Sequence, residues 1–454
     1  MTAAPQLLRS FLDALEVFRP LLTQPSYAHF ITLVAGWVLT TGRHAVTEAL
    51  VCADVARRRH HEAYHRFFSR GTWHPDWFGL VVFEWITRHL AARAPICAVI
   101  DDTLAPKKGP QVFGLGCHLD PVHSTRRQRI FCFGHCWVVL ALLVPVPFAV
   151  RPWALPILFR LYRTKKECAA KGAAYRKKTE LARDLLDVLV GWAGDRRIEV
   201  RADCAYCNDT VTRNLPQQVV LIGAMRPDAV LTTLPDDAGP GAQGGRRRKR
   251  GTVLPKPEAL ARDDGVAWRT CQVFLYGQWR HVRFKECCAQ WYRACGTGLL
   301  RIVVVQVLTG TLGLRVYFST DPTQSATQIL ERYGERWFIE LAFRNLKQLL
   351  GFGQSSARKR QAVERTAPFV GIIYSVLVLW FVDHVFGARS ELAAPPVRPW
   401  YRHKQGLSFA DVLRTAQRVL APLDVLDPGR GLADLHQLPS VKSAPSRVPI
   451  KRAA

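Results

Sequence analysis

The sequence predicts a mixed α/β fold in which a sheet with flanking helices is interrupted by a β-rich insertion domain and preceded by a helical N-terminal domain. Three observations support this prediction. Apolar residues recur at three- and four-residue spacing over residues 1–92, which is typical of amphipathic helices. Short apolar runs at 96–100 and 219–224, and the buried-type segment 198–202 with apolar residues at alternate positions, indicate strands. Alternating segments between 272 and 318 indicate a further group of strands.

Composition narrows the class of protein before any motif is considered. The 454 residues include 63 Lys and Arg against 36 Asp and Glu, which gives a formal net charge of +27. An excess of this size on a folding chain points to a polyanionic partner, with nucleic acid ahead of an anionic membrane surface. It argues against an enzyme that acts on small neutral metabolites.

Secretion and membrane insertion are not expected. The first residues lack a basic segment followed by a clean apolar stretch, and 12 Cys in a chain of this length do not make a disulfide framework. The longest apolar runs, 137–150 and 368–382, are shorter than the ~20 residues that cross a bilayer. We interpret them as buried strands and a buried helix, and we expect a cytoplasmic protein.

The helical domain carries a basic patch at residues 57–61, Arg-Arg-Arg-His-His. A solvated helix face is the simpler interpretation of this patch. The net charge of the chain also allows a surface that contacts DNA. The pattern leaves both interpretations open.

Acidic residues are scarce, and three of them follow predicted strands. Asp101 and Asp102 come directly after 96–100, and Asp203 comes directly after 198–202. In α/β proteins a side chain at the carboxyl end of a strand reaches the crevice where sites lie. An Asp that turns the chain from strand to loop is the alternative, and periodicity alone does not decide between the two.

The middle of the chain is predicted to contain one long helix and then a β-rich unit. Residues 165–193 indicate a helix with a basic start that ends at Gly194. Residues 236–257 are rich in Gly, Pro and Arg and predict a loop, whose Arg-rich segment 246–250 has no evident purpose. Four strands are predicted after this loop, at 272–276, 281–284, 302–308 and 314–318.

A long helix is predicted from Ser325 to about Leu350, and one of its faces is polar. Residues seven and fourteen apart nearly coincide in helical projection, which places five side chains on one side: Tyr333, Arg336, Glu340, Arg344 and Lys347. A single carboxylate therefore lies among groups suited to phosphate contact. An ordinary amphipathic helix with i,i+4 charge pairs is the alternative.

The spacing within this segment resembles the signature of a known family. Tyr333, Arg336, Glu340 and Lys347 are separated by two, three and six residues. This is the Tyr-Arg-Glu-Lys signature of bacterial insertion-sequence transposases of insertion-sequence family four and its close relatives. The resemblance covers about residues 95–385 and implies a DDE triad on a ribonuclease H-like fold.

The resemblance extends to the two predicted strands that lead into Asp residues. Asp102 with the Thr that follows it, and Asp203 with the Ala-Tyr pair shortly after it, look like the family's first and second acidic motifs. The resemblance therefore implies Asp102, Asp203 and Glu340 as the catalytic and metal-binding triad. Asp101 is a rival for the first position, and Asp102 is preferred because the family's acid is followed by Thr.

Metal binding and DNA contact follow from the implied triad. Three carboxylates are hard ligands suited to Mg²⁺ or Mn²⁺, and two such ions support in-line displacement at a phosphodiester. The resemblance implies two ions, with Tyr333, Arg336, Arg344 and Lys347 as DNA contacts around the reacting phosphate. Trp291 is a candidate for stacking on a flipped base, against the alternative that it packs in the core.

The implied protein is a DNA transposase of an insertion sequence, associated with the bacterial nucleoid. It would bind terminal inverted repeats in double-stranded DNA, cleave them and join them to target DNA by cut-and-paste through a hairpin, as a homodimer in the synaptic complex. A ribonuclease H-like nuclease without strand transfer, or a domesticated and inactive DNA-binding derivative, is the alternative.

The predicted domains follow the same division. They are a helical N-terminal domain for DNA binding or dimerisation (1–92), the first part of the ribonuclease H-like core (93–226), the β-rich insertion (227–320), the second part of the core with the Glu helix and a buried helix (321–390), and a C-terminal helix with a basic tail (391–454).

Overall fold

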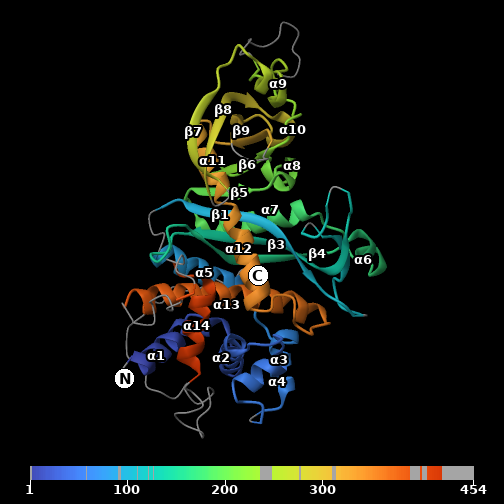
Figure 1. The fold of residues 1–454 in the computed structure, drawn as a ribbon. Coiled ribbons are helices and arrows are strands. Elements are labelled where there is room, and N and C mark those ends of the chain that lie inside the picture. The colour runs from blue at the N-terminus through green and yellow to red at the C-terminus, as the bar shows by residue number, and fades with distance from the viewer. Residues whose placement is uncertain are drawn as a thin grey trace.

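The fold is seen in a computed structural model. It describes residues 3–421, except 58, 90–93, 110, 121, 126, 236–247, 276–277, 309–312, 389–398 and 401–405. Helices from both ends of the chain lie at one end of the molecule, a large sheet with helices on its faces lies in the middle, and the β-rich unit lies at the other end (Figure 1). Part of the Arg-rich segment 246–250 and the basic tail from 422 fall outside the described residues.

The predicted helices of the N-terminal region are confirmed. They are α1 (Ala3–Glu16), the single-turn η1 (Arg19–Leu21), α2 (Gln24–Leu39), α3 (Val46–Cys52), α4 (His61–Ser69) and α5 (Pro75–His89). Helices α13 (Arg360–Trp380) and α14 (Phe409–Leu420) return to pack on them. The Phe369 ring of α13 lies 5.1–6.2 Å from those of Phe30, Trp37, Phe67 and Phe68, which ties the two ends of the chain into one aromatic core.

The central sheet has the strand order of a ribonuclease H-like core, as expected. Its strands are β1 (Ile96–Pro106), β3 (Phe131–Val144), β4 (Trp153–Tyr162), β5 (Ile198–Ala202) and β6 (Val219–Met225). Strand β3 pairs antiparallel with β1 and with β4, whereas β5 runs parallel to both β1 and β6. The short β2 (Gly116–Leu119) pairs antiparallel with the first residues of β3, beyond the end of β1. The result is three antiparallel strands followed by two parallel ones.

The β-rich unit continues this sheet. Its strands are β7 (Arg269–Leu275), β8 (Gln278–Gln290), β9 (Leu299–Val307) and β10 (Arg315–Ser319), with the short helices α9 (Pro257–Arg262) and α10 (Tyr292–Cys295). Strand β10 pairs with β6, so the described strands form one ten-stranded sheet. The Trp291 ring packs edge-on against Phe318 at 5.5 Å, which favours its role in packing over one in base stacking.

The remaining helices lie beside the sheet or on one another. They are α6 (Lys165–Ala170), α7 (Lys178–Ala193), the single-turn η2 (Cys204–Tyr206), α8 (Asp209–Thr212), α11 (Ala326–Gly334), α12 (Trp337–Leu349) and the π-helical turn η3 (Phe381–Phe386). Helices α7, α12 and α13 pack on β4, and α12 also packs on β1.

Two helices that the sequence predicted as continuous are interrupted. The segment 165–193 breaks after α6, where Gly172 takes a positive φ of 61°, and α7 restarts at Lys178. The segment 325–350 breaks between α11 and α12. There Arg336 donates its backbone N–H to Tyr333, and Ile339 donates to Arg336, at the three-residue spacing of a tighter turn.

The apolar helix near the C-terminal end is a core element. The helical segment 360–386 is long and apolar enough to cross a membrane, but 83% of its most apolar 18-residue stretch is buried inside the protein. This agrees with the prediction of a buried helix at 368–382.

Candidate active site

The two neighbouring acids Asp101 and Asp102 lie inside β1, so the predicted strand end at Ile100 is too early. The parallel partner β5 stops at the pair Ala202–Ile100, but β3 remains paired with β1 as far as Pro106 and keeps it extended. Successive residues of a strand point to opposite faces of the sheet. The two carboxylates therefore enter different surroundings.

Asp101 faces helix α12 and shares a guanidinium with Glu340. Arg336 donates from Nη1 to Asp101 Oδ2 at 2.6 Å and from Nη2 to Glu340 Oε1 at 3.0 Å. The Arg336 side chain is 12% exposed, that of Asp101 17% and that of Glu340 36%. The break between α11 and α12 thus places one cation between an acid of β1 and an acid of α12.

The pKa values at this cluster reflect its burial and its excess of carboxylates. Burial raises the pKa of Asp101 to about 7; Arg336 opposes this rise, whereas the charges of Asp102 and Asp203 add to it. Burial alone would lower the pKa of Arg336, but Asp101, Glu340 and Asp203 are among the groups that raise it above its usual value. Three carboxylates therefore act on a single guanidinium.

Asp203 reaches this cluster from the neighbouring strand. It directly follows β5 and caps η2, where its Oδ1 accepts the backbone N–H of Cys204 at 2.6 Å. Because β5 runs parallel to β1, Asp203 emerges at the same edge of the sheet as Asp101. The structure brings Asp101, Asp203 and Glu340 within electrostatic reach of Arg336.

Asp102 faces helix α7 and has a different set of partners. Its Oδ2 accepts from Lys178 Nζ at 2.6 Å and from the Cys136 thiol at 3.3 Å, and its Oδ1 accepts from the Tyr206 hydroxyl at 2.7 Å. Burial favours a higher pKa for Asp102, but the Lys178 ammonium and the hydrogen bonds outweigh it, so the pKa is lowered. Asp102 is therefore an ionised group, and both of its carboxylate oxygens accept hydrogen bonds.

The remaining signature residues are spread over three environments. Tyr333 is 4% exposed; its ring lies tilted 4.3 Å from that of Tyr317 in the core, and the Arg336 guanidinium lies over it at 6.0 Å. Lys347 is half-buried; burial lowers its pKa, and the charges of Asp120, Cys136 and Asp102 oppose this. Arg344 is exposed. Tyr333 is therefore a buried neighbour of Arg336, on the other side of the helix break from Glu340.

A buried ion network links the strand before Asp203 to the joint before α12. Arg201 is 2% exposed; it donates to Glu335 Oε2 at 2.8 Å and to the Glu199 backbone carbonyl at 2.8 Å. Glu199 also accepts from Arg332 of α11 at 3.0 Å. The network fixes the position of α12, and with it Glu340, relative to β5.

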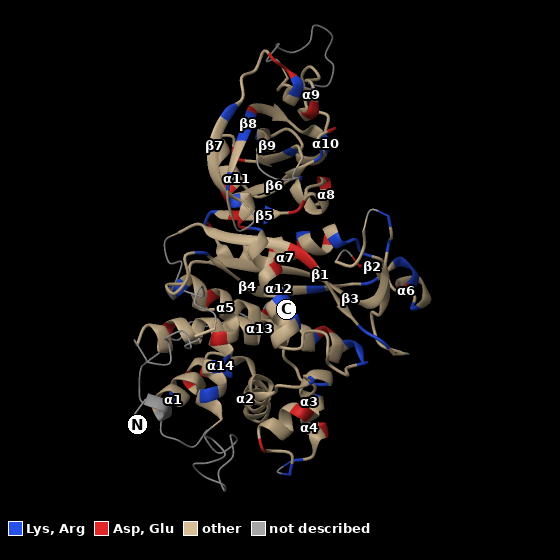
Figure 2. Ribbon diagram, in the orientation of Figure 1, with Lys and Arg blue, Asp and Glu red and all other residues tan. Residues whose placement is uncertain are grey.

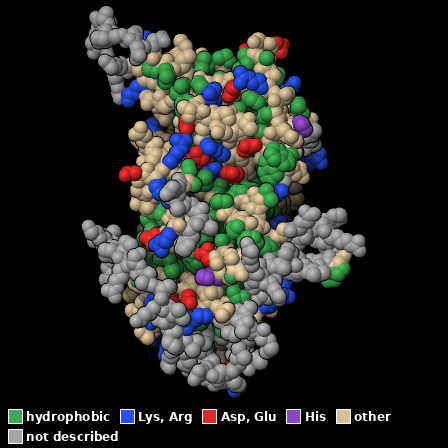
Figure 3. Space-filling view, turned by 90° about the vertical axis from the view of Figure 1, so that its left-hand side faces the viewer, with side chains coloured by type: hydrophobic (Ala, Val, Ile, Leu, Met, Phe, Trp, Pro, Cys, Tyr) green, Lys and Arg blue, Asp and Glu red, His purple; other side chains and the backbone are tan. Residues whose placement is uncertain are grey.

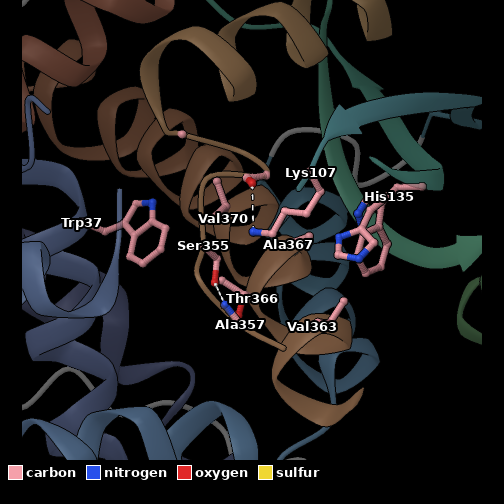
Figure 4. A pocket seen from close by; sticks show the side chains of 12 residues that line it. Trp37, Lys107, His135, Ser355, Ala357, Val363, Thr366, Ala367 and Val370 are labelled. Atoms are coloured by element: carbon pink, nitrogen blue, oxygen red, sulfur yellow. Dashed lines mark hydrogen bonds between the residues drawn. The ribbon is translucent and has the colours of Figure 1, made fainter. Parts of the chain in front are cut away.

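The far end of β1 is tied to the far end of α12. Lys107 Nζ donates to the Gly353 carbonyl at 3.3 Å (Figure 4). Gly353 has a positive φ of 92°, and a Cβ there would meet the Ala105 side chain. His135 lies nearby with its Nε2 bonded to the Phe113 carbonyl at 2.9 Å, and burial lowers its pKa to about 4.

The acid cluster suits a hard divalent cation, although it is not a closed ligand set. Within the described ranges, no three His, Cys, Asp or Glu side chains lie close enough together to hold a metal ion. Arg336 occupies the space between Asp101 and Glu340. Carboxylate oxygens are the donors that Mg²⁺ and Mn²⁺ prefer, and these carboxylates already gather around one cation. The residues fit a divalent ion once the guanidinium withdraws from one of the acids.

Sequence reasoning did not assign three residues of this region to the site. Lys178 appears in the sequence only as one of several basic residues, and its contact with Asp102 depends on the break before α7. Tyr206 belongs to the second acidic motif, which is a usable signal. Arg201 interrupts an apolar strand, and a charged residue in such a run signals a buried partner.

The chain is similar to a known family in sequence and to a solved structure in fold. Residues 17–286 match the family described as DDE superfamily endonuclease. No curated protein matches the sequence. Among solved structures, the chain is similar to a piggyBac transposase in a synaptic complex with hairpin DNA, with a TM-score of 0.42 and 10% identity over 93% of this chain and 78% of that one.

Proposed function

Because the chain belongs to the DDE superfamily endonuclease family, we propose that it is a DNA transposase that cleaves the ends of a mobile element and joins them to target DNA. One observation carries the proposal. Asp101 in β1, Asp203 after β5 and Glu340 in α12 come from distant parts of the chain, and all three act on Arg336.

We assign Asp101, rather than Asp102, as the first metal-binding acid. Asp101 shares Arg336 with Glu340, whereas Asp102 faces the other side of the sheet and is engaged by Lys178, Tyr206 and Cys136. This differs from the choice that the Asp-Thr resemblance favoured. Asp102 then serves as an ionised group that anchors Lys178 beside the site.

The chemistry depends on charge at the reacting phosphate. Mg²⁺ or Mn²⁺ ions held by Asp101, Asp203 and Glu340 would supply activation of the attacking oxygen and neutralisation of the leaving oxygen. When Arg336 withdraws from an acid, its planar guanidinium becomes available to a phosphate oxygen. Lys347, in the same helix, adds a second positive charge near the DNA backbone.

The partner is double-stranded DNA, at the element ends and at the target. The net charge of +27 supports this, because each phosphate contact by Lys or Arg releases counterions. We extend the proposal to an insertion-sequence context, a cut-and-paste route through a hairpin and a homodimer in the synaptic complex, all of which rest on the Tyr-Arg-Glu-Lys resemblance.

The test is cleavage of end DNA by the purified full chain. A labelled duplex from the flank of the gene, incubated with Mg²⁺, should be nicked at the element end and joined to a target plasmid. Glu340→Gln should lower the rate more than about 100-fold, since even outer partners of metal ligands are worth about 10- to 100-fold. Glu331→Gln, on the preceding helix, is the matched control and should cleave normally.

Other outcomes separate the alternatives. Cleavage without joined products would indicate a nuclease. Binding of end DNA without cleavage in any divalent metal would indicate an inactive DNA-binding derivative. Equal cleavage by Glu340→Gln and the wild type would refute the acid cluster as the active site.

A further inference from the structure

A hollow of about 750 Å³ lies at the outer edge of the central sheet, lined by residues that the acid cluster does not include. It opens between β4, the segment from α6 to α7, and the start of α13. Five arginines from these elements line it: Arg160, Arg163, Arg176, Arg360 and Arg365. The acidic residues in its lining are Asp76 and Glu364, and Arg163 and Arg176 pair with the adjacent acids Glu167 and Asp184, so five positive charges meet four negative ones.

Two of the arginines are fixed parts of the wall. Arg160 makes two bonds of 2.8 Å to the Asp76 carboxylate, which holds β4 to the start of α5. Arg365 donates to the Phe68 carbonyl at 3.0 Å and lies over the Trp73 ring. These contacts set the shape of the hollow and hold two cations in it.

Two other arginines are open to a ligand. The Arg360 side chain is 70% exposed and pairs with Glu364, and the Arg176 side chain is 46% exposed and pairs with Asp184. Exposed pairs of this kind contribute little and exchange readily for a stronger anion. Arg360 and Arg163 both lie over the Phe113 ring, at 5.7 and 4.8 Å, so two guanidinium groups share one aromatic support.

The hollow lies two strands from the first acid of the proposed centre. In the sheet, Asp101 pairs with Val139, and Val139 pairs with Phe159, which lines the hollow. Two strand spacings separate Asp101 from Phe159, which is about 10 Å. On the other face of β1, Lys178 binds Asp102 and lies 5.5 Å from the Tyr162 ring of β4. Lys178 therefore adds positive charge between β1 and the hollow.

Lys and Arg gather in the segment beside the hollow. Figure 2 shows them around α6 and the neighbouring loops. On the left-hand side of the molecule as drawn in Figure 1, which Figure 3 shows, basic side chains are interspersed with acidic and apolar ones. Positive charge around α6 favours a polyanion beside the hollow.

We propose that this hollow binds backbone phosphates of the DNA strand next to the reacting phosphate. The inference rests on the proposed function, and it adds a binding surface that the acid cluster does not include. At a rise of about 3.4 Å per nucleotide, a separation of about 10 Å places the bound phosphates within about three nucleotides of the cleavage point. Arg176 and Arg360 contact them, and Arg160 and Arg365 shape the wall.

The test measures DNA affinity as a function of salt in the Glu340→Gln background, which prevents cleavage. Arg176→Gln with Arg360→Gln should weaken binding of end DNA by roughly tenfold or more. It should also reduce the dependence of log affinity on log salt by about 2, since each lost phosphate contact removes about 0.9 from the slope. The loss should be the same for unrelated sequences.

The matched control is Arg269→Gln. The Arg269 side chain is also 70% exposed and has a carboxylate partner, Glu286 at 2.8 Å. It lies in β7 of the β-rich unit and should leave both affinity and slope unchanged. Circular dichroism and thermal melting of each variant verify that the fold is intact.

A second measurement locates the contact on the DNA. Methylphosphonate substitutions within three nucleotides of the cleavage point should weaken binding to the wild-type surface but not to the double variant. An unchanged slope in the double variant, or equal methylphosphonate effects on both proteins, would overturn the inference while leaving cleavage intact. If the wild-type chain neither binds nor cleaves end DNA, the proposed function itself fails. If inorganic phosphate binds in the hollow but the double variant binds DNA as tightly as the wild type, the inference is also overturned.

Discussion

Replacing Arg336 with Met should destabilise the protein in a way that a divalent cation reverses. Met removes the guanidinium and keeps a flexible, unbranched side chain. The bond to Asp101 joins side chains that are 12% and 17% exposed, and leaving a buried charge without its partner costs about 3–5 kcal/mol. The bond to Glu340, at 36% exposure, adds less than about 1 kcal/mol. For 454 residues, the combined loss of about 3–6 kcal/mol lowers Tm by about 3–6 °C.

The cation should recover most of this loss. At a hundredfold excess over its Kd, a ligand that binds the folded state alone stabilises it by about 2.7 kcal/mol. Mn²⁺ added to metal-free Arg336→Met should therefore raise Tm by about 3 °C, which is about half or more of the amount that the substitution lowered it. The wild type should gain less, because its Arg336 must first give way. The assay is a thermal melt of both proteins over a Mn²⁺ titration.

The matched control is Lys178→Met, which removes the other cation of the region. Lys178 bonds to Asp102 at 2.6 Å, on the opposite face of β1. Its variant should lose stability without gaining more from Mn²⁺ than the wild type does. A larger Mn²⁺ effect in Lys178→Met than in Arg336→Met would refute the assignment of Asp101. The absence of any Mn²⁺ effect in Arg336→Met would refute cation binding at these acids.

Two further predictions concern the frame around the site. Arg201→Met should cost about 1.5–3 kcal/mol in a denaturant titration, because the charged hydrogen bond from buried Arg201 to Glu335 is lost, while Glu199 keeps its bond to Arg332. Arg197→Met, at 46% exposure, should cost less than about 1 kcal/mol. Equal costs would contradict the role of the network. The pKa of His135 is about 4 in the folded protein and 6.5 in the unfolded chain, because burial lowers it. Between these pH values the unfolded chain binds more protons than the folded protein. The free energy of unfolding therefore falls by about 3 kcal/mol as the pH drops from 6.5 to 4. His135→Gln should lose that part of the pH dependence in denaturant titrations, and an unchanged pH profile would contradict it.

Much of the architecture could be predicted from local patterns. The run 96–100 is a strand and the apolar stretch 368–382 is a buried helix, because burial on all sides leaves a continuous apolar sequence. The acids were found because they directly follow predicted strands in a chain with few carboxylates. These signals depend on neighbouring residues, which a sequence shows directly.

The geometry of the site could not be predicted in the same way. The break at Arg336 depends on long-range packing: Gly334, just before it, lies against the Phe274 carbonyl of β7, where a Cβ would clash. The choice between Asp101 and Asp102 depends on which face of β1 meets α12. The contact of Lys178 with Asp102 spans 76 positions of the sequence. Each of these facts concerns segments that are distant in the chain and adjacent in the fold.

Metal-specific rescue of the acids tests the central claim most directly. A thiolate is a softer ligand than a carboxylate and suits Mn²⁺ better than Mg²⁺. Asp101→Cys, Asp203→Cys and Glu340→Cys should each lose end-DNA cleavage in Mg²⁺ and regain part of it in Mn²⁺, while Asp102→Cys should show no such difference between the metals. Rescue of Asp102→Cys by Mn²⁺, with Asp101→Cys equally active in both metals, would contradict the proposed centre.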